Sequence, residues 1–220
     1  TFIATANAIA YNGAIPIFID VDIDTMGLSS KAVAEFLEEF GDLRDDGCYN
    51  KKTGKKISAC LPMHTFGFPV HLDELIAVCN KWNIPIVEDA AESIGSEYKG
   101  LPTGSFGKLG VFSFNGNKIV TSGGGGAIVT NDIQLAMKAK HLTTTAKVPH
   151  PYEYVHDEIG YNFRMPNLNA ALGSAQIENL NKFLRSKRKL FLKYCKEFLK
   201  VNNVIILHNG FMAVFFVPII

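Results

Sequence analysis

The feature that most restricts the fold of this chain is the alternation of short apolar segments with segments of helical periodicity. Three segments, 32–40, 73–82 and 132–142, carry apolar residues at helical spacing, and two of them begin with an aspartate in N-cap position. The segments that are nearly continuous in apolar residues, as buried strands are, are 14–22, 56–64, 84–90, 109–114 and 126–131. This order predicts an α/β fold with a mostly parallel central sheet.

The segments outside this alternation indicate how the chain is divided. Residues 42–56 are charged and contain glycine, which predicts an exposed excursion between a helix and a strand. The connection 143–158 is long and irregular, and such connections inside a compact domain are often functional. Periodicity over 167–201 predicts one or two long helices. We therefore expect a large domain over 1–175 and, over 176–220, a linking helix with the start of a small C-terminal α+β domain.

Composition narrows the classes of partner. The net charge is +1 and no long Lys/Arg run occurs, which argues against a nucleic-acid surface and favours small-molecule chemistry. The cysteines are scattered without CxxC or His/Cys ligand spacing, so we expect neither disulfides nor a metal site, as in a reducing cytoplasm. No segment has the pattern of a leader or the length of a bilayer span, so no membrane association is expected.

Both ends of the sequence suggest a piece of a longer protein. No initiator Met precedes TFIATANAIA, and the final segment 211–220 stops inside a predicted strand. We therefore expect part of any active site to lie outside this sequence.

Polar residues follow three of the predicted strands. His64 ends the second strand, Asp89 lies at the end of the third, and Ser113 and Lys118 lie at and after the end of the fourth. Because ligands bind beyond the carboxyl ends of strands in open α/β sheets, these residues should lie close together. An aspartate in such a poorly hydrated place needs a cationic partner or several donors to stay ionised. The alternative for Asp89 is an N-cap of the turn that follows.

Lys118 lies in FSFNGNKIVTSGGGGAIVT (112–130), between a predicted strand and four glycines. A Walker phosphate loop has its glycines before the lysine and Ser or Thr after it, whereas here the glycines follow and Ile119 comes next. The glycine run leads into a strand, so we interpret it as a tight passage close to the pocket. Two alternatives remain for Lys118: an exposed lysine before a turn, or a lysine made reactive by desolvation that forms a Schiff base.

Several separated motifs, in their order and spacing, resemble the DegT/StrS nucleotide-sugar aminotransferases. They are TFIATANAIAYNGAIPIFIDVD, MHTFGFP, VEDAAESIGS, YKGLPTGSFGKLGVFSFNGNK, TSGGGGAIVT and GYNFRMPNLNAALGSAQ. The resemblance covers the chain from residue 1 to about residue 194. It implies a pyridoxal 5'-phosphate (PLP) enzyme with the aspartate-aminotransferase-like fold, PLP fold type I.

The resemblance also implies roles for single residues. Lys118 becomes the lysine that binds the cofactor as a Schiff base and then moves the proton as general base and acid. Asp89 becomes the carboxylate that faces the pyridine nitrogen, where an anion favours the protonated ring, which is the better electron sink. Ser113 matches the serine that binds the cofactor phosphate. Glu92 stands beside the ring oxygen, where many relatives carry Gln or His.

Four further residues belong to the implied site. Phe2 matches the aromatic residue that stacks on the pyridine ring. Asn162 matches the asparagine that reaches the cofactor phosphate of the neighbouring subunit, which implies a homodimer with a shared active site. Arg164 is a candidate for a contact with substrate phosphate or for dimer packing. His64 is a candidate for a substrate contact or for a structural role at the end of a strand.

The implied reaction transfers the amino group of an amino acid, by resemblance L-glutamate, to a keto group of a nucleotide-linked sugar. The segments DGCYNKKTGKKI, SFNGNK and YEYVHDEIGYN look most like the LegC-type enzymes of legionaminic-acid and related surface-sugar pathways. These enzymes aminate a UDP-linked 4-keto-6-deoxy-N-acetylhexosamine. The alternatives are a sugar dehydratase of the same family, in which histidine replaces the lysine, and a catalytically silent nucleotide-sugar-binding module. The family's upstream Gly-Thr phosphate segment and most of its C-terminal domain are not in this sequence.

Overall fold

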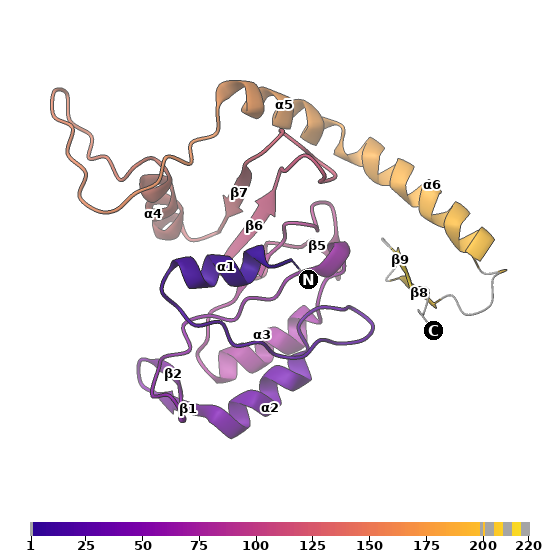
Figure 1. The fold of residues 1–220 in the computed structure, drawn as a ribbon, viewed down its shortest axis with the longest axis horizontal. Coiled ribbons are helices and arrows are strands. Elements are labelled where there is room, and N and C mark those ends of the chain that lie inside the picture. The colour runs from indigo at the N-terminus through magenta and orange to yellow at the C-terminus, as the bar shows by residue number, and fades with distance from the viewer. Residues whose placement is uncertain (1, 199, 201–204, 209–212, 217–220) are drawn as a thin grey trace.

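The centre of the molecule is a three-stranded mixed sheet (Figure 1), as the computed structural model describes it for residues 2–198, 200, 205–208 and 213–216. The strand order is β3 (Val87–Asp89), β6 (Leu109–Ser113), β7 (Gly126–Val129). β3 and β6 are parallel, and β6 and β7 are antiparallel. The three strands lie inside three of the predicted segments, so the α/β class is confirmed.

A further segment lies beside β3 without forming a regular strand. Parallel bridges join Cys60 to Ile86 and Met63 to Asp89, so the second predicted strand is in the expected place. Pro62 lies between the two bridges, and proline has no N–H to donate to a ladder. The pairing is therefore interrupted, and the sheet is parallel on this side and antiparallel at β7.

The prediction of a buried strand over 14–22 is wrong. This segment forms a single antiparallel bridge, between Val21 and Leu28, and it belongs to no described sheet. Its apolar side chains are largely exposed, with Ile15 at 65% and Phe18 at 78%. An apolar run forms a strand only where a neighbouring strand can pair along it, and among the described residues this segment has one bridge and no ladder.

The three predicted helices are confirmed within two residues at each end. They are α2 (Ser30–Phe40), α3 (Leu72–Lys81) and α4 (Ile133–Thr143). Asp132 caps α4 as predicted, because its side chain accepts the backbone N–H groups of Gln134 and Leu135. The predicted cap of α3 is wrong: Asp73 lies inside the first turn and His71 holds the N-cap position. Asp73 there still complements the positive end of the helix dipole.

The polar segment after α2 is more ordered than predicted. It forms an antiparallel hairpin of β1 (Gly41–Arg44) and β2 (Gly47–Asn50), with Asp45 and Asp46 at the turn. Gly47 has a φ of 138°, which a residue with a side chain rarely adopts. Cys48 is fully buried, so the expected exposed excursion contributes one face to the core.

The core lies between α2, α3 and the hairpin. Figure 1 shows α2 and α3 side by side below the sheet. Gly41 allows their close approach, since a Cβ there would lie 2.6 Å from the Trp82 ring. The buried cluster consists of Val33, Leu37, Cys48, Val70, Leu72, Leu75, Cys79, Trp82, Ile84 and Ile86. This core supports β3 from one end and leaves its carboxyl end open.

The remaining elements surround this framework. Two long helices follow the irregular connection as predicted and run in series away from the sheet (Figure 1). The helix α5 crosses residue 175, and a domain boundary there stays a prediction. No helix in the described part of the chain is long and apolar enough to cross a membrane. The helices and strands not yet given are α1 (Ala4–Tyr11), η1 (Thr65–Gly67), β4 (Glu97–Tyr98), β5 (Leu101–Pro102), α5 (Asn167–Glu178), α6 (Leu180–Phe198), β8 (Ile205–His208) and β9 (Ala213–Phe216).

The predicted C-terminal strand is only partly described. β9 lies within 211–220, and it pairs antiparallel with β8. Residues 211–212 and 217–220 of that prediction lie outside the described residues.

Candidate active site

The carboxyl ends of β3 and β6 bring the first predicted site residues to one edge of the sheet. Asp89 is the last residue of β3, and its Cα pairs with that of Val111 in β6. Ser113, the last residue of β6, follows two positions later. Because the strands are parallel, both residues lie at the same edge. The expected convergence of these two strand ends is confirmed.

Lys118 reaches a carboxylate in the turn that follows β3. Its Nζ lies 3.4 Å from Glu92 Oε1, and the two side chains are only 17% and 27% exposed. The other carboxylate oxygen, Glu92 Oε2, accepts the backbone N–H of Phe66 at 2.8 Å. Glu92 therefore links the lysine loop to the short helix η1. A mostly shielded amine does not fit the alternative of an exposed surface lysine.

The Asp89 carboxylate is held by two neutral donors. Oδ2 accepts the hydroxyl of Thr5 at 2.5 Å, and Oδ1 accepts the backbone N–H of Ala91 at 3.1 Å. The second bond caps the turn that follows β3, as the alternative interpretation of Asp89 as an N-cap predicts. No Lys, Arg or His of the described residues forms an ion pair with Asp89. The cationic partner that a half-buried carboxylate needs is therefore not supplied by this part of the chain.

His64 lies in the core, not at the open edge. It is fully buried, and its Nε2 lies 3.0 Å from Oε2 of Glu88, which is also fully buried. The backbone N–H of Val70 points to His64 Nδ1 at 3.4 Å, so the ring proton belongs on Nε2 and is donated to the carboxylate. Both ring nitrogens are engaged. This geometry favours the structural role over a substrate contact.

Glu88 collects four hydrogen bonds around this pair. Besides His64, the backbone N–H groups of Gly104, Phe106 and Gly107 donate to it at 2.6–2.7 Å. Burial alone would raise the pKa of Glu88, but the hydrogen bonds from His64, Gly107 and Gly104 outweigh it and lower the pKa. Glu88 therefore stays ionised. Because Glu88 directly precedes Asp89 in β3, its hydrogen bonds fix the turn between β5 and β6 beside the end of this strand.

The other predicted site residues are more open. Ser113 Oγ accepts the backbone N–H of Asn115 at 3.3 Å, a long bond that leaves the hydroxyl proton free to be donated elsewhere. Phe2 is 69% exposed and precedes α1. Asn162 and Arg164 are exposed residues of the connection before α5, and among the described residues neither side chain bonds to the Lys118 group. Within one chain, the structure does not bring these two to Lys118.

The glycine run makes the passage that the sequence predicts. Gly123 and Gly125 have φ of 80° and 87°, and β7 begins at Gly126. A Cβ on Gly126 would lie 2.4 Å from the carbonyl oxygen of Phe112. The run turns the chain from the lysine loop into an antiparallel strand, not into a helix, so it is not a phosphate loop.

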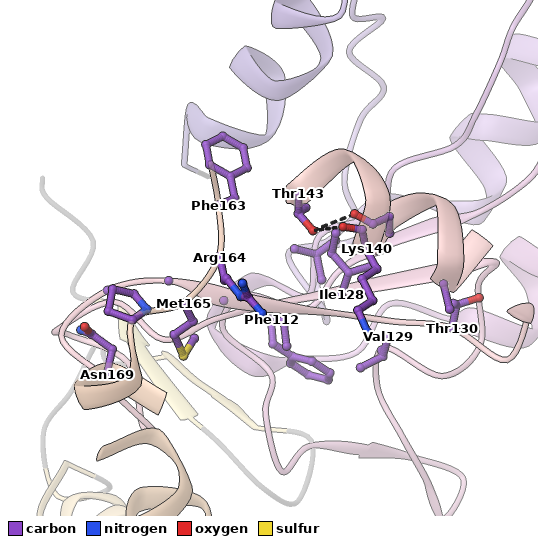
Figure 2. Close-up of a pocket in the computed structure, with 18 residues that line it drawn as sticks. Phe112, Ile128, Val129, Thr130, Lys140, Thr143, Phe163, Arg164, Met165 and Asn169 are labelled. Atoms are coloured by element: carbon purple, nitrogen blue, oxygen red, sulfur yellow. Dashed lines mark hydrogen bonds between the residues drawn. The ribbon is translucent and has the colours of Figure 1, made fainter. Parts of the chain in front are cut away.

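A hollow of about 1030 Å³ lies beside β7 (Figure 2), and Lys118 is not among the residues that line it. Its walls come from β7, α4 and the segment 163–166. Figure 2 shows Arg164, Lys140 and Phe112 around it. Of the predicted site residues, Arg164 alone lines it. The other predicted site residues lie outside the lining of this hollow.

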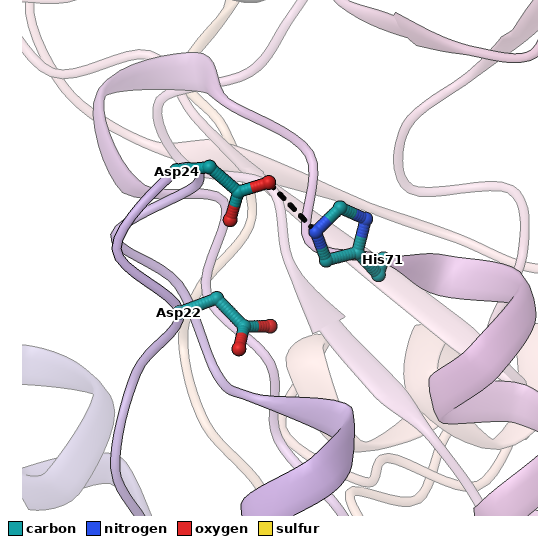
Figure 3. A group of neighbouring side chains, drawn as sticks. All are labelled: Asp22, Asp24 and His71. Atoms are coloured by element: carbon teal, nitrogen blue, oxygen red, sulfur yellow. Dashed lines mark hydrogen bonds and ion pairs between the residues drawn. The ribbon is translucent and has the colours of Figure 1, made fainter.

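Asp22, Asp24 and His71 form a group with metal-ligand chemistry on the loop beside α3 (Figure 3). Their ligand atoms all lie within 4.8 Å of one another. His71 Nε2 is 3.0 Å from Asp24 Oδ2, so the imidazole already has a carboxylate partner. This ion pair ties the loop to the N-cap of α3 and accounts for the arrangement without a ligand.

Comparison with known proteins identifies the family. The DegT/DnrJ/EryC1/StrS aminotransferase family matches residues 1–215. The chain belongs to this family. It is 41% identical over 194 residues to the putative pyridoxal phosphate-dependent aminotransferase EpsN of Bacillus subtilis, covering 88% of this chain and 47% of EpsN. It is 36% identical over 215 residues to the GDP-perosamine synthase of Escherichia coli O157:H7, covering 98% of this chain and 54% of that protein.

A solved structure of an aminotransferase supports the same fold. The aminotransferase PseC of Helicobacter pylori, involved in the biosynthesis of pseudoaminic acid, superposes with a TM-score of 0.82 at 27% identity, covering 94% of this chain and 52% of PseC. The fold is PLP fold type I, and the family uses pyridoxal 5'-phosphate. The chain spans about half the length of the curated relatives it matches.

Thr5 is the site residue that the sequence did not reveal. It lies 84 residues before Asp89, in a helix that was not predicted, and no local pattern connects the two. The only signal available was chemical: a half-buried carboxylate requires donors, and a hydroxyl at the start of a helix is one.

Proposed function

We propose that the protein is a PLP-dependent aminotransferase whose active site lies at the carboxyl edge of β3 and β6. The observation that carries this proposal is the shielded Lys118 amine beside Glu92, at the same edge as Asp89, a carboxylate that no cation of the described residues pairs with. A lysine, an unpaired carboxylate and a free hydroxyl donor are the three chemistries that a pyridoxal phosphate needs, for its aldehyde, its pyridine nitrogen and its phosphate.

The residues at this edge fit the cofactor. Asp89 would accept the pyridinium N–H, which supplies the cation that the described chain does not. Ser113 would donate its hydroxyl to the phosphate, and Phe2, at the start of α1, would pack on the ring face. Glu92 would contact the ring oxygen from the turn after β3. When bound, the cofactor supplies an electron sink for the bond broken at the substrate carbon.

Lys118 is the proton carrier of the proposed reaction. Its Nζ is the only lysine amine that an ion pair holds at this edge among the described residues, and Glu92 fixes its position. Lys118 would hold the cofactor through its Nζ, and the same amine would act first as base toward a proton on the substrate carbon and then as acid. A histidine at this position would suit a dehydratase, so the lysine favours transamination.

The proposed active site is shared between two subunits of a homodimer. Within one chain Asn162 forms a bridge with Thr144 and, among the described residues, no hydrogen bond with Lys118, although the family resemblance assigns it to the cofactor phosphate. A twofold interface would account for this difference, because Asn162 of one protomer could then reach the cofactor phosphate in the site of its partner. In the same assembly Arg164 would contact the substrate phosphate or the interface. His64 is proposed as a structural residue that borders the site.

We propose a nucleotide-linked keto sugar as the amino acceptor and L-glutamate as the amino donor. The names of GDP-perosamine synthase and of PseC, both concerned with amino sugars, support the sugar. The finer proposal is a UDP-linked 4-keto-6-deoxy-N-acetylhexosamine, in a cytoplasmic pathway to legionaminic acid or a related surface polysaccharide. The large domain over 1–175 would carry the cofactor.

Borohydride trapping tests the proposal. The full-length protein is incubated with pyridoxal phosphate, its visible absorption is recorded before and after reduction, and the modified peptide is mapped. A reduced adduct on Lys118 is expected, and Lys118→Ala should give none. Lys31, which is 83% exposed, provides the matched control, since Lys31→Ala should label like the wild type. No adduct, or adducts only on other lysines, would refute the proposed function.

A further inference from the structure

Thr5 and Asp89 form the shortest contact at the proposed cofactor edge. Thr5 Oγ1 lies 2.5 Å from Asp89 Oδ2, within the range of an O–H···O⁻ bond to an ionised acceptor. Thr5 Oγ1 also lies 3.8 Å from the sulfur of Met63. A hydroxyl has one proton, and a carboxylate is a far stronger acceptor than a thioether, so the proton goes to Asp89.

The two donors on Asp89 come from opposite directions. Thr5 belongs to α1, and Ala91 belongs to the turn after β3. With one donor on each oxygen, the plane of the carboxylate is fixed. An ionised carboxylate has about four lone-pair positions, so two stay available for a further donor.

The same bond fixes the helix that carries Phe2. No residue of α1 is buried, and Thr5 is the residue of α1 whose side chain hydrogen bonds to another element in the described part of the chain. Phe2 lies three residues before Thr5. A helix with so little burial depends on each polar contact for its position, so the Thr5 hydroxyl also sets where Phe2 stands.

From these contacts we propose that Thr5 is a positioning residue, which orients the Asp89 carboxylate toward the pyridine nitrogen. The inference rests on the proposed function and extends it to a residue outside the predicted site. Thr5 acts through Asp89 and touches neither substrate nor cofactor in this role. The Thr5 hydroxyl strengthens the contact between Asp89 and the pyridine nitrogen. Loss of this hydroxyl should therefore weaken the binding of pyridoxal phosphate more than the binding of an analogue that lacks the nitrogen.

The experiment compares Thr5→Val, which keeps the shape and removes the hydroxyl, with Thr5→Ser, which keeps the hydroxyl. Full-length apoprotein is titrated with pyridoxal phosphate and with its 1-deaza analogue, in which C–H replaces the pyridine nitrogen. Thr5→Val should raise the Kd of pyridoxal phosphate by about tenfold, as expected for one hydrogen bond to a charged group. The Kd of the deaza analogue should change much less, and Thr5→Ser should bind both as the wild type does.

Three outcomes would overturn the inference. An equal loss for both ligands in Thr5→Val would mean that Thr5 only docks α1. An unchanged Kd of pyridoxal phosphate in Thr5→Val would mean that the hydroxyl does not contribute to binding. A Thr5→Ser protein that binds pyridoxal phosphate as weakly as Thr5→Val would mean the same. Thr5→Ala replaces Thr5→Val if the valine variant does not fold. Failure of the proposed function is separate, because then the wild-type protein itself forms no Lys118 adduct.

Discussion

The amine of Lys118 and the carboxylate of Glu92 lie 3.4 Å apart, and the second oxygen of that carboxylate holds the backbone of Phe66. Phe66 has a positive φ of 53°, which a residue with a side chain adopts only when its surroundings hold it there. The ion pair is mostly shielded from water, so screening weakens it less than a surface pair. Glu92 thus couples the lysine to the turn that borders the site.

Substitution of Glu92 should weaken cofactor binding. Glu92→Ala removes both acceptor oxygens and should raise the Kd of pyridoxal phosphate by about tenfold, the effect of losing about one charge-assisted hydrogen bond. Glu92→Gln keeps an acceptor for the Phe66 N–H and should lose less. Absorbance titration of the apoproteins measures both values. A wild-type Kd in Glu92→Ala would contradict a role for this carboxylate at the ring.

Lys118→Ala should abolish turnover while leaving the fold intact. Removal of a proton carrier costs about 10²–10⁴-fold in rate, and loss of the covalent link adds to this. Loss of the amine breaks the shielded pair with Glu92, so the free energy of unfolding should fall by about 1–2 kcal/mol while the fold stays intact. Urea unfolding and a transamination assay measure the two effects. Added methylamine should restore part of the rate, and a variant with near-wild-type turnover would show that Lys118 is not the carrier.

Glu88 should control stability at acidic pH. The folded-state pKa lies below the unfolded value of 4.5, so its contribution is present above pH 4.5 and is lost as the pH falls through the folded-state pKa. Glu88→Gln replaces the charged acceptor of four hydrogen bonds with an amide whose NH2 group cannot accept, and should cost about 2–3 kcal/mol at pH 7. The stability of this variant should then fall less than that of the wild type on acidification. The free energy of unfolding in urea between pH 7 and pH 3.5 measures both effects.

A matched substitution separates this network from the general effect of removing a carboxylate. Glu35 is 69% exposed and pairs with Lys31 at 3.9 Å. Glu35→Gln should leave both the stability at neutral pH and its decline in acid close to those of the wild type. An acid decline in Glu88→Gln equal to that of the wild type would show that Glu88 is not the group that titrates.

The sequence predicted elements well where local signals act alone. The cap of α4 is such a case. The Asp132 side chain accepts the backbone N–H groups of Gln134 and Leu135, which follow it directly in the sequence, so no distant residue is needed. The segment 14–22 is the opposite case. Its apolar residues match a buried strand, but pairing depends on a partner strand elsewhere in the chain, which periodicity does not report.

The site shows the same division. Asp89 and Ser113 could be placed together because each ends a predicted strand of one sheet. Thr5 could not be found, because its bond to Asp89 spans 84 residues and depends on where α1 lies. His64 also ends a predicted strand, yet it points into the core. Which face a strand-end residue takes is set by its partner, here the buried Glu88, and a sequence does not show that partner.

The shared active site makes a prediction about mixed dimers. If Asn162 completes the partner's phosphate site, Asn162→Ala should weaken cofactor retention, and an equal mixture with Lys118→Ala should regain activity. Half of randomly exchanged dimers are mixed, and each then has one site with both residues intact, so about a quarter of wild-type activity is expected. Each variant alone should stay inactive or weakly active. If Asn162 served its own subunit, every site in a mixed dimer would lack one residue.

The measurement therefore decides between the two arrangements. The variants carry different affinity tags, subunits are exchanged, and the mixed dimers are purified through both tags before transaminase activity and bound cofactor are measured. One active site per mixed dimer supports the shared site. Absence of recovery in confirmed mixed dimers would place Asn162 outside the partner's site, and would leave the connection between α4 and α5 with a structural role in the subunit to which it belongs.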